Sequence, residues 1–219
     1  MRKMLEAAMG RALLATAVLI TTALPVLAGP PLICHPFDIG TAKSLPFGDT
    51  SEGWRGWQAT LPSYDRARLV DDTLALLAPA TPIIVRMETL RRASAYAIED
   101  GARATALLRA LQARAPKGAP ANRGEALALF DAGYLVETYR QLGDRGIAVK
   151  AEIAGIDGYA MVETALAQQP DDPTMQFAAA LMAATPARKS LQATHLQKAR
   201  AGARADTLLA RNLTTHFMN

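Results

Sequence analysis

The 219-residue sequence predicts an all-α protein, with about seven helices in antiparallel hairpins and an irregular N-terminal arm. Three observations support this class. Apolar residues recur at three-four spacing through alanine-rich segments after residue 62. Prolines separate these segments from one another. No segment shows the alternating, β-branched pattern that is typical of strands.

The first 28 residues have the pattern of a signal peptide. Basic residues among the first eleven precede an apolar run at 12–24, and the small residues of "VLA" allow cleavage after Ala28. The run is shorter than the roughly 20 residues of a membrane-spanning helix, which favours cleavage. We therefore expect a periplasmic or secreted chain that begins at Gly29. An uncleaved N-terminal helix that retains the protein is the alternative.

Residues 29–62 form the predicted arm, and residues 63–219 form the predicted helical domain. The arm is rich in proline and glycine and has no sustained period. It nevertheless holds Phe37, Phe47, Trp54 and Trp57 in a chain with few aromatic residues. Because such side chains are rarely left in water, we expect the arm to lie against the helices.

The segments with helical spacing are separated by prolines and glycines. The predicted helices cover about 63–77, 82–98, 101–115, 124–143, 146–169, 174–184 and 187–212. Ser63 and Thr81 are the predicted caps of the first two. The helix at 124–143 is apolar on two sides, which is typical of a helix between two neighbours. Glycines in 146–169 allow a break near Asp157.

Two helix junctions look alike. "ALLAPATP" at 75–82 and "ALAQQPDDP" at 165–173 both end a helix with Ala-Leu and then place Pro-x-x-Pro before the next helix. They resemble the tetratricopeptide repeat over about Pro82 to Ala203. The tryptophan of that family's first helix is missing, with Gln176 near its place, and one interval is too long for a single unit. The resemblance implies an irregular hairpin array with a concave face that binds peptides or proteins.

A second resemblance concerns the arm. "LICHPFDIG" and "AKSLPFG" are similar to the opening of a group of exported bacterial proteins of uncharacterised function. This likeness implies export and no particular activity.

Cys34 and His35 are the pair that suggests chemistry. A thiolate activated by an imidazole is a nucleophile. However, Pro36 favours an extended His35, and neighbours in an extended segment point to opposite sides. A helper would have to be His195 or His216. As the only cysteine, Cys34 cannot form an intrachain disulfide, so burial, contact with another chain or reactivity are its open roles.

Metal binding and a charged groove are the other candidate sites. Cys34, His35 and Asp38 could supply three metal ligands, but the usual zinc spacings are absent and no cofactor is expected. The charged residues of the second helix could line a groove for an acidic ligand, or form an exposed face with internal ion pairs. These residues are Arg86, Glu88, Arg91 and Arg92.

The C-terminal region is basic. Its charged residues are Arg188, Lys189, Lys198, Arg200, Arg204 and Arg211, opposed by Asp206. Such a face could meet anionic lipid, cell-wall polymer or an acidic protein, or it could simply be solvated. Nucleic acid is not expected as a partner outside the cytoplasm.

The sequence therefore predicts an exported interaction module without catalytic activity, with a protein or peptide partner in the cell envelope. The alternative is an envelope enzyme or thiol protein that uses Cys34. In a third hypothesis the arm itself fills the groove of the helical array.

Overall fold

The computed structural model describes residues 30–49, 59–98, 100–143 and 149–217, and these ranges contain helices and no strand. The predicted all-α class is confirmed. The helices are α1 (Leu69–Leu76), α2 (Ile83–Ala97), α3 (Gly101–Arg114), α4 (Arg123–Gln141), α5 (Lys150–Ile153), α6 (Gly158–Leu166), α7 (Pro173–Met182), α8 (Lys189–Gly202) and α9 (Leu208–Phe217). Short 3-10 turns lie at Arg66–Arg68 and Pro186–Arg188. The predicted signal peptide, Trp54 and Trp57 lie outside the described residues.

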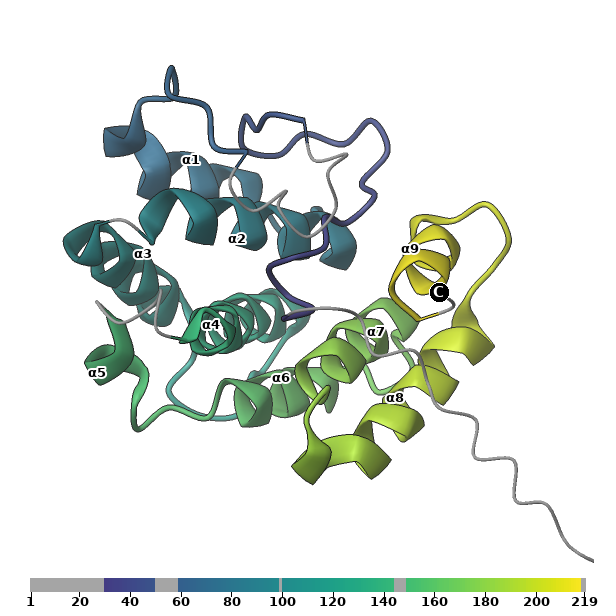
Figure 1. Ribbon diagram of the computed structural model, residues 1–219. Helices are drawn as coiled ribbons and strands as arrows, with labels where there is room; N and C mark the ends of the chain where they lie inside the picture. The colour runs from purple at the N-terminus through teal and green to yellow at the C-terminus, as the bar shows by residue number, and fades with distance from the viewer. Residues whose placement is uncertain (1–29, 50–58, 99, 144–148, 218–219) are drawn as a thin grey trace, which may run out of the picture.

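Helix α4 is the central helix of the molecule. It packs against α2, α3, α5 and α6, and Figure 1 shows it surrounded by these elements. Every residue from Ala126 to Tyr139 is buried. The prediction of a helix between neighbours on two sides is confirmed, because apolar residues on both faces need partners on both faces.

Helix α2 is also buried almost all the way round. The arm covers Glu88 and Arg91, and Asp131 of α4 and the Thr81 carbonyl bind Arg86, so that all three are at most 1% exposed. The sequence interpretation of a solvent-exposed charged face on this helix is therefore wrong. Its expected ion pairs nevertheless form, inside the protein.

The first two helices begin at different residues from those expected. Asp65, rather than Ser63, caps the 3-10 turn that leads into α1, by accepting a hydrogen bond from the Ala67 N–H. Thr81 makes no N-terminal cap on α2. Its hydroxyl donates instead to the Leu76 carbonyl, and so serves the end of α1.

The predicted break at Asp157 is present, and it separates α5 from α6. Asp157 caps α6 by accepting from the Ala160 N–H. Gly158 then lets the start of α6 approach α4 closely: a Cβ there would lie 2.4 Å from the Gly133 carbonyl oxygen. These two glycines allow a closer backbone approach than a helix with side chains at both positions would permit.

The predicted helix at 187–212 is instead two helices, α8 and α9. Helix α8 ends at Gly202, where a Cβ would lie 2.5 Å from the Cβ of Pro173. The connection contains Asp206 with a φ of 63°. This left-handed residue turns the chain back, so that α9 lies against α7 and the arm (Figure 1).

The arm is part of the hydrophobic core. Leu32, Ile33, Phe37 and Leu45 are at most 4% exposed and belong to the same core cluster as α2, α4 and α7. The predicted anchoring of the arm by Phe37 and Phe47 is confirmed. Phe37 packs edge-on to Phe177, and Phe47 edge-on to Tyr96. In the described part of the chain, no helix is both long enough and apolar enough to cross a bilayer.

Candidate functional site

The structure places Cys34 in the core. Its N–H donates to the Pro30 carbonyl at 3.0 Å, which closes a turn over residues 30–34, just before His35. The cysteine is 5% exposed, and a buried thiol in apolar surroundings is not an accessible nucleophile. His35 stands edge-on to His216, with ring centroids 6.0 Å apart. His195 lies elsewhere, bonded to Tyr159.

Asp38 joins the arm to α9. Its carboxylate accepts from the Arg211 guanidinium at 2.6 Å, and this hydrogen bond holds the pKa of Asp38 below its usual value. Asn212 accepts from the Asp38 N–H at 2.9 Å and donates to the Asp38 carbonyl at 2.8 Å. Asp38 therefore holds the arm against α9. Across the described ranges, no group of three or more metal-ligating side chains comes together.

Glu88, Arg91 and Arg92 form a buried cluster beneath the arm. Glu88 accepts from Arg91 at 2.7 and 2.8 Å, from Arg92 at 2.7 Å and from the Phe37 N–H at 3.0 Å. Burial alone would raise the pKa of Glu88, but the two guanidinium groups outweigh it and hold that pKa below its ordinary value. Arg92 also donates to the Leu45 carbonyl at 2.7 Å.

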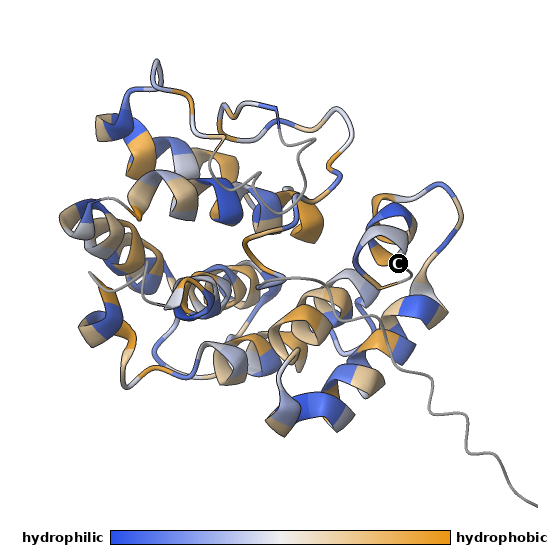
Figure 2. Ribbon diagram, in the orientation of Figure 1, coloured by the Kyte–Doolittle hydropathy of each residue, from blue (hydrophilic) through white to orange (hydrophobic). Residues whose placement is uncertain are grey.

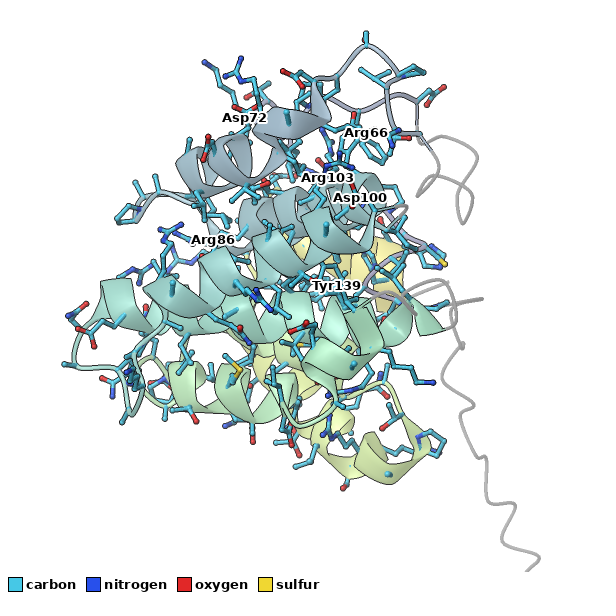
Figure 3. All side chains as sticks on the ribbon, turned by 90° about the vertical axis from the view of Figure 1, so that its left-hand side faces the viewer. Arg66, Asp72, Arg86, Asp100, Arg103 and Tyr139 are labelled. Carbon is cyan, nitrogen blue, oxygen red and sulfur yellow. The ribbon has the colours of Figure 1, made fainter. Side chains whose placement is uncertain are left out.

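Arg86 belongs to a separate buried pair. It donates to Asp131 of α4 at 2.6 Å and to the Thr81 carbonyl at 3.0 Å. Burial raises the pKa of Asp131 to about 7 because the Arg86 charge opposes it only in part. Figure 3 shows Arg86 in the interior below α1, whereas Asp72 lies on the outer side of that helix. The four charged residues predicted to line one groove therefore form two internal clusters.

Two buried polar side chains near the arm form no hydrogen bond of regular geometry with the described residues. They are the Tyr134 hydroxyl and the ring nitrogens of His216. His216 is 1% exposed and stacks on Phe37 with centroids 4.7 Å apart. Burial lowers its pKa to about 4, and the neighbouring His35 lowers it further, while Glu88 opposes the shift. This histidine is neutral at pH 7 and contributes an aromatic contact.

An open hollow of about 530 Å³ lies between the end of α4, the α5–α6 connection and the turn before α8. We call it the charged pocket. Its lining residues are Glu137, Arg140, Ala154, Gly155, Ile156, Asp157, Thr185, Ala187 and Arg188. Two guanidinium groups and two carboxylates therefore face a cavity whose size is typical of ligand sites.

One side of the charged pocket is built on α4. Glu137 is 4% exposed, and it accepts from the Arg140 guanidinium and from the Tyr159 N–H at 3.2 Å. Arg140 also donates to the Ile156 carbonyl, which ties the end of α4 to the α5–α6 connection. The buried carboxylate thus fixes the exposed guanidinium in position.

The other side is built around Arg188, which lies 3.6 Å from Asp157 and 4.3 Å from the centre of the Tyr159 ring. The Tyr159 hydroxyl bonds to His195 Nε2 at 2.8 Å, and His195 Nδ1 bonds to Gln176 at 2.7 Å. Desolvation lowers the pKa of His195 despite the nearby Glu163. A buried polar network thus supports the aromatic ring on which Arg188 rests.

Sequence reasoning did not find the charged pocket. Its residues come from three separate segments of the chain. Only Asp157 and Arg188 belonged to predicted features, a helix break and a basic stretch. Arg140, at the end of a helix, gave no signal of its own. The site depends on how the helices pack, which local spacing does not encode.

We found no protein-family model, no curated protein and no solved structure that matches this chain.

Proposed function

We propose that this protein is an exported, non-catalytic binding module that recognises a polypeptide partner in the cell envelope through the charged pocket. The observation that carries the proposal is the open hollow of about 530 Å³ with guanidinium and carboxylate groups in its wall. The α2 residues that could have lined a groove are inside the protein, where Glu88 and Arg92 bind the arm and Arg86 binds α4.

The chemistry of the charged pocket suits a peptide segment better than a single ion. Arg140 and Arg188 offer N–H donors for carbonyl or carboxylate oxygens, and Asp157 offers acceptors for amide N–H groups. Exposed backbone at Ala154 and Gly155 adds further polar groups. Because each guanidinium already has a carboxylate neighbour, the pocket has little net charge to attract an isolated anion.

Two features from the sequence support the wider setting. The leader pattern of the first 28 residues supports export. The likeness of the helix junctions to tetratricopeptide repeats supports a binding role for the array. A thiol function is not proposed, because Cys34 is built into the core.

Site-directed crosslinking tests the proposal. Thr185 is exposed at the charged pocket and the only natural cysteine is buried, so Thr185→Cys gives one accessible thiol there. A thiol-reactive photocrosslinker on this residue should capture a discrete envelope protein. The same probe on Thr214→Cys, on the exposed side of α9, should not capture it.

Two double variants test whether the guanidinium groups of the pocket bind the partner. The pocket variant carries Arg140→Gln and Arg188→Gln, and the control carries Arg68→Gln and Arg109→Gln. The second pair removes the same charge from guanidinium groups that are 69% exposed and lie outside the pocket. We expect the pocket variant to lose at least about tenfold in capture and the control to keep it. Equal capture by both variants, or no specific capture by the wild type, would refute a binding role for this pocket.

A further inference from the structure

The outer face of α8 is a cationic surface with no acidic residue of its own. Helix α8 packs on α7 through its buried residues His195, Leu196 and Ala199, and its opposite side is exposed. No aspartate or glutamate occurs from residue 189 to residue 205. Figure 2 shows hydrophilic segments along α8, next to the more hydrophobic α7.

Two of the six basic residues of this region have acidic partners away from the outer face of α8. Arg188 faces Asp157 across the charged pocket, and Arg211 pairs with Asp38 of the arm. The remaining four are exposed. Lys189, Lys198 and Arg200 lie on α8, where Arg200 also donates to the Phe217 carbonyl at 3.4 Å, and Arg204 follows in the connection to α9. Within the described part of the chain, no carboxylate forms a salt bridge with any of these four.

The charges lie along both edges of the exposed face. With a turn of about 100° per residue, Lys189 and Arg200 share one edge, and Lys198 shares the other with Leu191. Leu191 is 42% exposed, the largest exposure of a bulky apolar side chain in the described ranges. Small and polar residues fill the strip between the edges: Ser190, Ala193, Thr194, Gln197 and Ala201.

Acidic residues occur beside α8 but not on it. Asp172, which precedes the Pro173 that packs on Gly202, caps α7 by accepting from the Thr174 and Met175 N–H groups. Asp206 follows α8 in the turn before α9. Glu163 of α6 contacts His195, which belongs to the packed side of α8. The outer face therefore presents cations on two edges of a helix with uncharged residues between them, and this spread of positive charge is complementary to an extended anionic surface.

We propose that the outer face of α8 docks on an anionic phospholipid surface, with Lys189, Lys198 and Arg200 against the headgroups and Leu191 at the interface. Long basic side chains reach a membrane plane from both edges of a helix that lies parallel to it. Each basic residue near an anionic surface strengthens association by about fivefold. None of these residues lines the charged pocket, although Lys189 directly follows Arg188 of its wall.

Vesicle co-sedimentation tests the inference with the protein from Gly29 onward. This form keeps every residue of the described core. Vesicles of about one-third phosphatidylglycerol in phosphatidylcholine should pellet the protein at low salt. Pure phosphatidylcholine vesicles should not, and salt of about 0.5 M should release it.

The decisive comparison uses two variants with equal net charge. Lys189→Gln with Lys198→Gln should lower binding about 25-fold. Lys43→Gln with Lys117→Gln removes two exposed lysines from the arm and from the α3–α4 connection, and should leave binding within about twofold. Circular dichroism checks that both variants fold.

Three outcomes would overturn the inference: no binding of the wild type to anionic vesicles, equal loss in both variants, or equal binding to neutral vesicles. Binding of soluble poly-glutamate through the same lysines, without binding to vesicles, would also overturn it, because that result would assign the surface to an acidic polypeptide.

Discussion

At the scale of single residues, His216 shows how a polar side chain can serve as an apolar one. Its ring is enclosed by Phe37 at 4.7 Å, Phe177 at 5.7 Å and His35 at 6.0 Å, and next to the Pro36 backbone its nitrogens form no hydrogen bond of regular geometry with the described residues. Burial lowers its pKa to about 4. Because folded His216 does not bind a proton at a pH where the unfolded chain does, the free energy of unfolding falls in that pH range.

The sign of that effect gives the first prediction. Between pH about 6.5, the unfolded value, and pH about 4, the unfolded chain binds a proton that folded His216 does not. His216→Phe removes this difference. At pH 7 the free energy of unfolding of the variant should equal or exceed that of the wild type. As the pH falls from about 6.5 to about 4, the difference between the two should grow by about 1.4 kcal/mol per pH unit, to about 3 kcal/mol.

Urea unfolding of both proteins from pH 7 to pH 4 measures this difference. Comparing the variant with the wild type cancels the opposite contribution of Asp131, whose raised pKa makes the folded state bind a proton more readily than the unfolded state does. A stability difference that stays constant over this range would show that His216 is not a buried neutral group.

The charged residues of α2 show what the sequence can and cannot predict at this scale. The spacing of Glu88 with Arg91 and Arg92 predicted ion pairs, and they form. Their burial was not predictable, because it depends on the arm, which comes from a region without periodicity. The local spacing of charged residues is the same for an exposed ion pair and for an ion pair that a distant segment covers.

At the scale of elements, the contact between α4 and α6 depends on two glycines. A Cβ on Gly133 would lie 2.6 Å from the Gly158 carbonyl oxygen and 2.8 Å from the Met161 Cβ. Both obstacles are close to the backbone, so they cannot rotate away. Alanine at this position would push the two helices apart, and they hold one side of the charged pocket.

The second prediction is that Gly133→Ala destabilises the protein by about 1–3 kcal/mol, even though alanine is the better helix former by about 1 kcal/mol. Thermal unfolding followed by circular dichroism measures it. Gly118→Ala is the control, because a Cβ at Gly118 meets nothing within 4 Å. A Gly133→Ala protein as stable as this control would mean that the helices separate at no cost.

Element boundaries were predictable where side chains mark them locally. Asp100, Asp157 and Asp172 each cap a helix near a predicted junction. The split between α8 and α9 was missed, because its cause is partly tertiary: Gly202 packs against Pro173 of another helix. An alanine-rich, basic stretch with one glycine reads as a continuous helix when that neighbour is unknown.

At the scale of the whole molecule, the arm completes the fold. Side chains from three helices bind its backbone: Glu88 at Phe37, Gln141 at Leu32 and Asn212 at Asp38. This arrangement matches the third hypothesis drawn from the sequence, in which the arm fills the groove. It also explains why residues 30–49, which form neither helix nor strand, contain so many apolar side chains.

The third prediction follows from the size of that contribution. Burial of Leu32, Ile33, Phe37 and Leu45 stabilises the fold by about 1.5–3 kcal/mol each, or about 6–12 kcal/mol before the entropy of ordering the arm. This is comparable to the whole stability of about 5–15 kcal/mol expected for such a domain. A chain that begins at Ser63 should therefore lack a cooperative thermal transition, whereas a chain that begins at Gly29 should show one.

A synthetic peptide of residues 30–47 separates loss of the core from a merely shortened chain. Added in excess to the chain from Ser63, it should restore near-ultraviolet circular dichroism and a cooperative transition, because the groove holds these residues through backbone hydrogen bonds and Phe37. The same peptide with Phe37→Ala should restore much less, since that side chain is 3% exposed and packs on α7 and α9. If the chain from Ser63 unfolds cooperatively by itself, at the midpoint of the longer chain, the arm is a cover on a complete domain and the groove beneath it becomes a binding face in its own right.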